Sequence, residues 1–349
     1  MAMDQSTTLI EFLQATGARV RIYDLGRRVV RISKDQFLKF EETRLPYPQP
    51  LQNHAWFGLS MLDRAVSDEP VIWFLRLPLD EQGKLVQASR DYFIHRLLEV
   101  ALEKQTGEHA EADAFKDNPY IFKPKEDRMA VFHAKLARDL GRPPSRYYEH
   151  SLDYFSGIPG WDQWSFVGYQ GIADVAARVD DAAISDLLIQ AIPRLPQTPL
   201  TALCHCLENE SLALPLSQAL LNRLQAELAA AEPDLAVVTS LVRGLSRSIS
   251  ATTRERMFGL VMDSPYATHI ELLTAISGRA WELLQKPEHA SRYLEALAHS
   301  AAGQSAFNHC LSDLLAMPGL RTPLLQAVRD PGRSEELASA FGAMMQQLT

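Results

Sequence analysis

The chain has 349 residues, of which 46% are hydrophobic and three are cysteines, and its formal net charge is −8. Such a composition is typical of a globular protein with a large core, and the length favours about two domains. No apolar run reaches the ~18 residues that a membrane-spanning helix needs, and residues 1–8 lack the pattern of a signal peptide. We therefore expect a cytoplasmic protein that is not embedded in a membrane and keeps its cysteines reduced.

The negative charge is concentrated in the second half of the chain. Residues 161–349 contain 13 Lys and Arg against 20 Asp and Glu, so they carry −7 of the net charge. A surface of this sign repels a phosphate backbone. Nucleic acid is therefore not an expected partner of this half.

Strand patterns dominate the first hundred residues. Apolar and polar side chains alternate in two neighbouring runs, which predicts a β-hairpin, and a third run is almost continuously apolar, as in a buried strand. The predicted elements are a helix at 7–15, strands at 19–23, 30–32, 55–61 and 71–77, and a helix at 90–104. Strands joined in this way favour an α+β domain with a small antiparallel sheet over residues 1–104.

A helical, aromatic-rich junction is predicted over residues 105–170. Its first part, 105–118, is polar and acidic, which indicates an exposed loop. Apolar residues at helical spacing follow at 126–140 and 145–155, and the helical pattern resumes after Gly157, Pro159 and Gly160.

After Asp180 the pattern becomes repetitive. Predicted helices of about 11–18 residues alternate with breaks at proline, glycine and polar residues. Similar helix starts at Leu200, Leu235, Ile270, Phe307 and Leu337 are separated by 35, 35, 37 and 30 residues. Helix-pair repeats have this period. The sequence therefore predicts an all-α, HEAT-like helical-repeat solenoid over residues 171–349, with a non-repetitive helical bundle as the alternative.

Three short segments resemble a known family. They are Phe74–Leu85, Arg90–Ile94 and Asn118–Phe122. Their sequences are similar to those of an uncharacterised bacterial (proteobacterial) protein family of unknown function, and the similarity extends over the whole chain. The resemblance implies a bacterial cytoplasmic origin and assigns no catalytic residue.

No established catalytic, cofactor or metal motif is present. The chain lacks a Walker-type phosphate loop, a dinucleotide-binding glycine pattern, a nucleophile elbow and a His-Glu-x-x-His zinc motif. Cys204-His205-Cys206 points to different faces of a helix and is interpreted as core packing rather than zinc binding. His109-Ala110-Glu111 lacks the cysteine pair of zinc deaminases and is interpreted as a loop. We assign no catalytic residue, cofactor or metal ligand.

Five arginines crowd the predicted hairpin and make a candidate basic patch. They are Arg19, Arg21, Arg27, Arg28 and Arg31. Charges on an edge strand commonly prevent self-pairing, which is the favoured interpretation. The alternatives are a site for phosphate or an acidic partner, including nucleic acid, and docking of the hairpin on the acidic solenoid.

The segment from Arg146 to Tyr169 is the most distinctive in the chain, because aromatic and polar side chains alternate along it. The candidate ligand-binding or partner-binding residues are Arg146, Tyr147, His150, Asp153, Tyr154, Trp161, Trp164 and Tyr169. A structural junction is the favoured interpretation, since aromatic residues with a polar end suit a domain boundary. A partner or ligand surface comes second, and an active site using His150 and Asp153 comes third.

The leading hypothesis is a non-catalytic adaptor or scaffold that binds a protein through the concave face of the solenoid. One alternative is an enzyme or small-ligand-binding protein with its site between Tyr147 and Tyr169. Another is nucleic-acid binding through the arginine hairpin.

Overall fold

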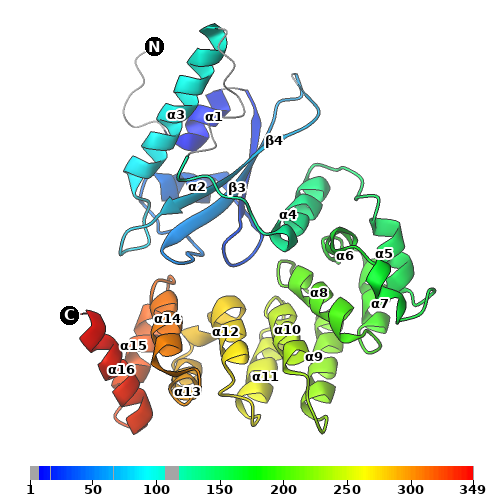
Figure 1. Cartoon of the computed structure of the whole chain (residues 1–349), viewed down its shortest axis with the longest axis vertical. Coiled ribbons are helices and arrows are strands. Elements are labelled where there is room, and N and C mark those ends of the chain that lie inside the picture. Colours follow the sequence, from blue (N-terminus) through cyan, green and yellow to red (C-terminus); the bar gives the residue numbers. More distant parts are fainter. Residues whose placement is uncertain (1–7, 16, 66, 107–117, 349) are drawn as a thin grey trace. The chain divides into compact units, whose positions relative to one another are not determined.

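The computed structural model describes residues 8–15, 17–65, 67–106 and 118–348. The chain separates into two compact units (Figure 1). The N-terminal unit runs up to Lys125 and includes Ala316–Pro318, and the helical unit holds the rest. The expected exposed loop falls mostly on residues 107–117, which include His109 and Glu111. These residues lie outside the part of the chain that the structure describes.

The N-terminal unit is built on a four-stranded antiparallel sheet. Its strands are β1 (Arg19–Asp24), β2 (Val30–Ile32), β3 (His54–Leu62) and β4 (Val71–Pro78), in the order β2-β1-β3-β4. Ile22 pairs with both Ile32 and Leu59, and Leu75 pairs with Phe57, so apolar side chains share one face across the strands. The small antiparallel sheet predicted for this part of the chain is confirmed.

Three helices contribute to the core of this unit. They are α1 (Leu9–Ala15), α2 (Lys34–Glu41) and α3 (Gln87–Thr106). Phe37 of α2 packs edge-on against Phe57 of β3, with ring centroids 4.9 Å apart. Phe93 of α3 packs edge-on against Trp73 of β4, at 5.8 Å. The buried apolar face of the sheet is thus covered by side chains of these helices.

A short segment near Tyr120 pairs with the outer edge of β4, which the sequence did not predict. The backbone N–H of Arg76 donates to the carbonyl of Tyr120 at 2.8 Å, and that of Phe122 donates to the carbonyl of Phe74 at 3.1 Å. An exposed strand edge is a template for unwanted pairing, and this segment occupies part of it.

The buried carboxylate of Glu41 joins two of the helices. It accepts hydrogen bonds from the backbone N–H groups of Leu9 at 2.7 Å and Ile10 at 3.2 Å, at the start of α1. These N–H groups have no partner within their own helix. Burial raises the pKa of Glu41 to about 7, although the hydrogen bonds from Leu9 and Ile10 and the charge of Arg90 act in the opposite direction.

The helical unit consists almost entirely of α-helices. Its first elements are α4 (Glu126–Asp139), α5 (Tyr148–Phe155), η1 (Gln163–Phe166), α6 (Tyr169–Ala176), α7 (Ala182–Ala191), α8 (Gln197–Leu207), α9 (Leu214–Leu228) and α10 (Leu235–Leu245). They are followed by α11 (Ala251–Met262), α12 (Ile270–Arg279), η2 (Trp281–Gln285), α13 (Pro287–Ala298), α14 (Gly303–Leu315), α15 (Arg321–Arg329) and α16 (Glu335–Leu348). Within the described residues, no helix has the length and hydropathy needed to cross a membrane.

Alternate helices of this unit pack against one another. Helices α6, α8, α10 and α12 contact each other in succession, and so do α7, α9, α11 and α13. Figure 1 shows α8, α10 and α12 side by side, with α9 and α11 in a second row. The predicted mostly helical C-terminal region is therefore confirmed.

Residues 126–170 belong to the helical unit. Helices α4 and α5 both pack on α6, which in turn packs on α8. The structure thus places its unit boundary after Lys125. The three-part division of the sequence at 104 and 170 stays a prediction.

The raised pKa of Glu41 predicts a pH-dependent stability. A carboxyl with a pKa near 4.5 when unfolded and about 7 when folded binds its proton more tightly in the folded state, so it stabilises the fold most below pH 4.5. This contribution is lost as pH rises through 7. At 1.36 kcal/mol per pKa unit, the free energy of unfolding should fall by roughly 3 kcal/mol. Urea unfolding between pH 5 and pH 8 should show the loss in the wild type and a much smaller one in Glu41→Gln.

The exposed Glu81, in the turn after β4, offers a matched control. Glu81→Gln should keep the wild-type pH dependence. Equal pH dependence in Glu41→Gln and the wild type would contradict the assignment to Glu41.

Candidate functional site

The structure divides the candidate residues between Arg146 and Tyr169 into a packed set and an exposed set. Tyr154 is fully buried, and its hydroxyl donates to the carbonyl of Trp161 at 3.0 Å. The two rings pack edge-on with centroids 5.9 Å apart. Tyr169 is half-buried; burial raises its pKa far above the usual range, with its neighbour Cys206 contributing in the same direction. Tyr154 and Trp161 thus pack within the segment, whereas Tyr169 lies beside Cys206 of α8.

The exposed set presents large apolar side chains to solvent. Tyr147 is 43% exposed, Trp164 38%, Phe166 72% and Ile158 79%. We call these four residues the exposed apolar set; Ile158 and Phe166 were not among the candidates from sequence. The guanidinium of Arg146 lies 4.9 Å from the ring centroid of Tyr147 and donates to its hydroxyl at 2.7 Å. All four lie within the same stretch of twenty residues, and apolar side chains that are exposed together are typical of interaction surfaces.

His150 and Asp153 are both exposed, on α5. A site for acid–base chemistry on a small molecule is usually a concave place that excludes water. Both of these side chains are instead open to solvent.

The five arginines of the hairpin differ in exposure. Arg19 and Arg31 are exposed and Arg21 is half-buried, whereas Arg27 and Arg28 are each only 1% exposed. The Nε of Arg27 donates to the carbonyl of Pro50 at 2.9 Å. Only part of the candidate basic patch therefore lies on the surface.

The Cys204-His205-Cys206 triplet lies in α8, where both thiols are buried. Burial raises the pKa of Cys204 to about 12 and lowers that of His205 to about 4. A thiol that stays protonated is a poor metal ligand and a poor nucleophile. Among the described residues, no group of three or more His, Cys, Asp or Glu side chains could hold a metal ion.

A cluster of buried charge surrounds Glu208, directly after α8. This side chain is 2% exposed, and Arg243 binds both its carboxylate oxygens, at 2.6 and 3.0 Å. The Nε of Arg279 lies 2.8 Å from the same carboxylate. The guanidinium of Arg128 lies 3.8 Å away. The four residues form what we call the Glu208 cluster, and they come from α4, the end of α8, α10 and α12.

The carboxylate of Glu208 is kept in its charged form by the arginines around it. Burial by itself raises the pKa of Glu208, but the charges of Arg279, Arg243 and Arg128 outweigh it and hold the pKa at about 2. The carboxylate is therefore ionised at every pH at which the protein is expected to fold. Sequence analysis missed this cluster, although positions 208, 243 and 279 recur at steps of 35 and 36 residues, which is close to the helix repeat.

A second buried ion pair holds the turn that follows Glu208. The ammonium of Lys135, on α4, lies 2.6 Å from the carboxylate of Glu210 and donates to the carbonyl of Asn209 at 2.8 Å. The turn between α8 and α9 is thus bound to α4 at two successive points.

Backbone hydrogen bonds join this turn to the next one along the stack. The N–H of Leu212 donates to the carbonyl of Arg247, and the N–H of Ile249 donates to the carbonyl of Leu212, both at 3.0 Å. This short parallel bridge brings Ser211 beside Arg247, whose guanidinium donates to the serine hydroxyl at 3.2 Å. These bonds join two turns that lie more than thirty residues apart in the sequence, and together the two turns form one wall of a pocket.

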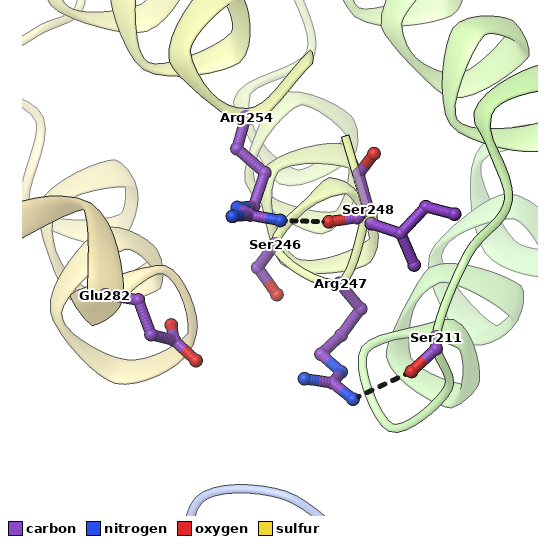
Figure 2. A pocket seen from close by; sticks show the side chains of 7 residues that line it. Ser211, Ser246, Arg247, Ser248, Arg254 and Glu282 are labelled. Atoms are coloured by element: carbon purple, nitrogen blue, oxygen red, sulfur yellow. Dashed lines mark hydrogen bonds between the residues drawn. The ribbon is translucent and has the colours of Figure 1, made fainter. Parts of the chain in front are cut away.

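That wall lines a pocket of about 220 Å³. The lining residues are Ser211, Ser246, Arg247, Ser248, Ile249, Arg254 and Glu282. Figure 2 shows Arg254 reaching in from α11, Arg247 from the end of α10 and Glu282 from η2. Arg254 also donates to the backbone carbonyl of Ser248. With two guanidinium groups, the hydroxyls of Ser211 and Ser248 and a single carboxylate in its lining, the pocket is suited to a small anion. We call it the two-arginine pocket.

The pocket was not found from the sequence because its walls come from three separate segments. The only local signal is the run Ser246-Arg247-Ser248-Ile249-Ser250, which resembles many polar turns.

The Glu208 cluster predicts a large loss of stability when its only acid is neutralised. Glu208→Gln removes a buried carboxylate that three arginines share, so we expect the free energy of unfolding at pH 7 to fall by about 3–5 kcal/mol. Because the pKa is lowered on folding, the contribution of Glu208 is present above pH 4.5 and is lost as pH falls toward 2. The difference between wild type and variant in urea unfolding should shrink accordingly at acidic pH.

Glu232→Gln serves as the control, since Glu232 is an exposed residue of the same unit. Adding Arg243→Met to Glu208→Gln should recover part of the loss, because it removes one uncompensated charge. A loss below about 1 kcal/mol, the range of surface ion pairs, would contradict a stabilising role of the cluster.

Comparison with protein-family models gives one match, which spans residues 4–345. The description of that family is protein of unknown function (DUF3549). Searches of curated proteins and of solved structures gave no match. The expected similarity to an uncharacterised family is thereby confirmed, and the chain belongs to the DUF3549 family.

Proposed function

We propose that this protein is a non-catalytic, cytoplasmic adaptor or scaffold that binds another protein. In this proposal, residues 171–349 form a HEAT-like α-solenoid, and its concave face provides the binding surface. The observation that carries the proposal is the packing of each helix on the helix after next, in α6, α8, α10 and α12 and again in α7, α9, α11 and α13. Stacks of this kind expose long surfaces and commonly bind proteins.

The spacing of the Glu208 cluster supports the repeat. Glu208, Arg243 and Arg279 follow one another at 35 and 36 residues, and each lies at or just after the C-terminal end of its helix. Equivalent positions in successive layers of a stack lie close in space. The direct contacts of Arg243 and Arg279 with one carboxylate agree with that arrangement.

Two surface features of the helical unit support protein binding. The first is the exposed apolar set, Tyr147, Ile158, Trp164 and Phe166. The second is a mostly apolar groove of about 470 Å³ that is lined by residues of α7 and α9 and includes Ala219. Aromatic residues with surrounding polar groups are enriched among the side chains that dominate protein–protein affinity.

The proposal is tested by affinity capture with the full chain from a native lysate. The double variant Trp164→Ser/Phe166→Ser removes two of the three aromatic rings of the exposed apolar set. Truncating two such anchors should reduce recovery of a stoichiometric partner by about tenfold or more. Met345→Ser, at an exposed methionine of α16, is the control and should leave recovery unchanged.

A second variant distinguishes the two surfaces. Ala219→Glu places a charge in the groove between α7 and α9. If only this variant loses the partner, the adaptor proposal stands and the binding surface is the groove within residues 171–349. Loss in Trp164→Ser/Phe166→Ser alone places the surface before residue 171 and counts against the concave face of the solenoid. Failure to recover any stoichiometric partner with the wild type, or equal recovery with all variants, counts against an adaptor.

A further inference from the structure

We propose that the two-arginine pocket binds a phosphate group, either as the free ion or on a phosphorylated side chain. The proposal concerns a ligand site and does not depend on the adaptor function. It rests on the side chains that line the pocket, on the backbone that fixes them and on the balance of charge.

The hydrogen-bonding groups in the pocket are mostly donors. A guanidinium carries five N–H donors and no acceptor, and Arg254 directs one of them to the carbonyl of Ser248. Arg247 contributes a second guanidinium, and Ser211 and Ser248 contribute hydroxyls that can rotate toward an anion. The hydroxyl of Ser246 donates to the carbonyl of Arg243 at 2.6 Å instead. Arginine forks match the oxygens of phosphate in geometry as well as charge.

The frame of the pocket is fixed before any ligand enters. The backbone bonds between Leu212, Arg247 and Ile249 hold two turns together. Ser250 caps the 12-residue helix α11 by accepting from the N–H of Thr253 at 3.2 Å, and the hydroxyl of Ser248 accepts from the N–H of Ser250 at 3.2 Å. A preorganised site loses little conformational entropy on binding.

Size and charge both suit a phosphate. The volume of about 220 Å³ accommodates a phosphate group together with a few water molecules. Two positive side chains face one negative side chain, Glu282, so the lining carries a net positive charge within a chain whose net charge is −8. Glu282 repels an anion, and neutralising it should strengthen binding.

The sign of the Glu282 effect separates the proposal from a different ligand class. If the ligand were a zwitterion such as a free amino acid, the carboxylate of Glu282 would be the natural partner of its ammonium group. Neutralising Glu282 would then weaken binding rather than strengthen it.

The experiment is calorimetric titration of the full chain with inorganic phosphate and, separately, with a short phosphoserine peptide whose termini are blocked and therefore carry no ammonium, at constant ionic strength in a phosphate-free buffer. Losing one charge-assisted partner should weaken binding about tenfold or more in Arg254→Gln. Glu282→Gln should bind several-fold more tightly. Arg256→Gln is the matched control, because Arg256 lies on the same helix, is exposed and does not line the pocket.

Thermal unfolding of each variant checks that it is folded, and Arg254→Lys provides a second probe that keeps the charge but loses the fork. We expect it to bind between wild type and Arg254→Gln. Tighter binding of the blocked phosphoserine peptide than of phosphate identifies a phosphorylated side chain as the source, and equal binding identifies the free ion. Absence of saturable binding to the wild type, equal affinities in Arg254→Gln and Arg256→Gln, or weaker binding in Glu282→Gln would each overturn the proposal.

Discussion

The helical unit depends on one buried carboxylate. An ion taken out of water loses several kcal/mol of solvation, and it is tolerated only where opposite charges and hydrogen bonds replace the water. Glu208 meets that condition through Arg243, Arg279 and Arg128, which lie on different helices. Hydrophobic attraction has no direction of its own, whereas a bidentate arginine–carboxylate pair holds only in one geometry. The cluster therefore sets the positions of α4, α8, α10 and α12 relative to one another.

The geometry of the two-arginine pocket follows from the same constraint. Glu208 and Glu210 hold the two sides of one turn, the first through arginines of neighbouring helices and the second through Lys135. The turn continues into Leu212, which bonds to the backbone of the next turn on both sides. A substitution in the Glu208 cluster is therefore expected to shift the backbone that forms the pocket wall, because only a few residues of chain separate the two. A substitution of a lining side chain such as Arg254 changes the pocket without moving that backbone.

The sequence predicted what depends on local periodicity and missed what depends on long-range partners. Alternation at Val20 and Ile22 was enough to predict β1, because one buried face leaves a period of two. Glu208 stands in the run Glu-Asn-Glu, which has the composition of an exposed turn, and its partners lie 35 and 71 residues further along. Helical spacing also predicts which face of a helix a residue lies on, but not how deeply its side chain is buried. The sequence therefore could not distinguish Tyr154, which is buried, from Tyr147, which is exposed.

Burial of arginines also changes the charge that the helical unit presents to a partner. Residues 126–349 have a net charge of −7. The Glu208 cluster holds three arginines and one glutamate in largely buried positions, so positive charge is withdrawn from the surface and the remainder of the unit is more acidic than its composition indicates. Acidic surfaces accelerate association with basic partners and disfavour acidic ones. For an adaptor with Trp164 and Phe166 exposed, this balance favours a partner surface that combines apolar and basic side chains.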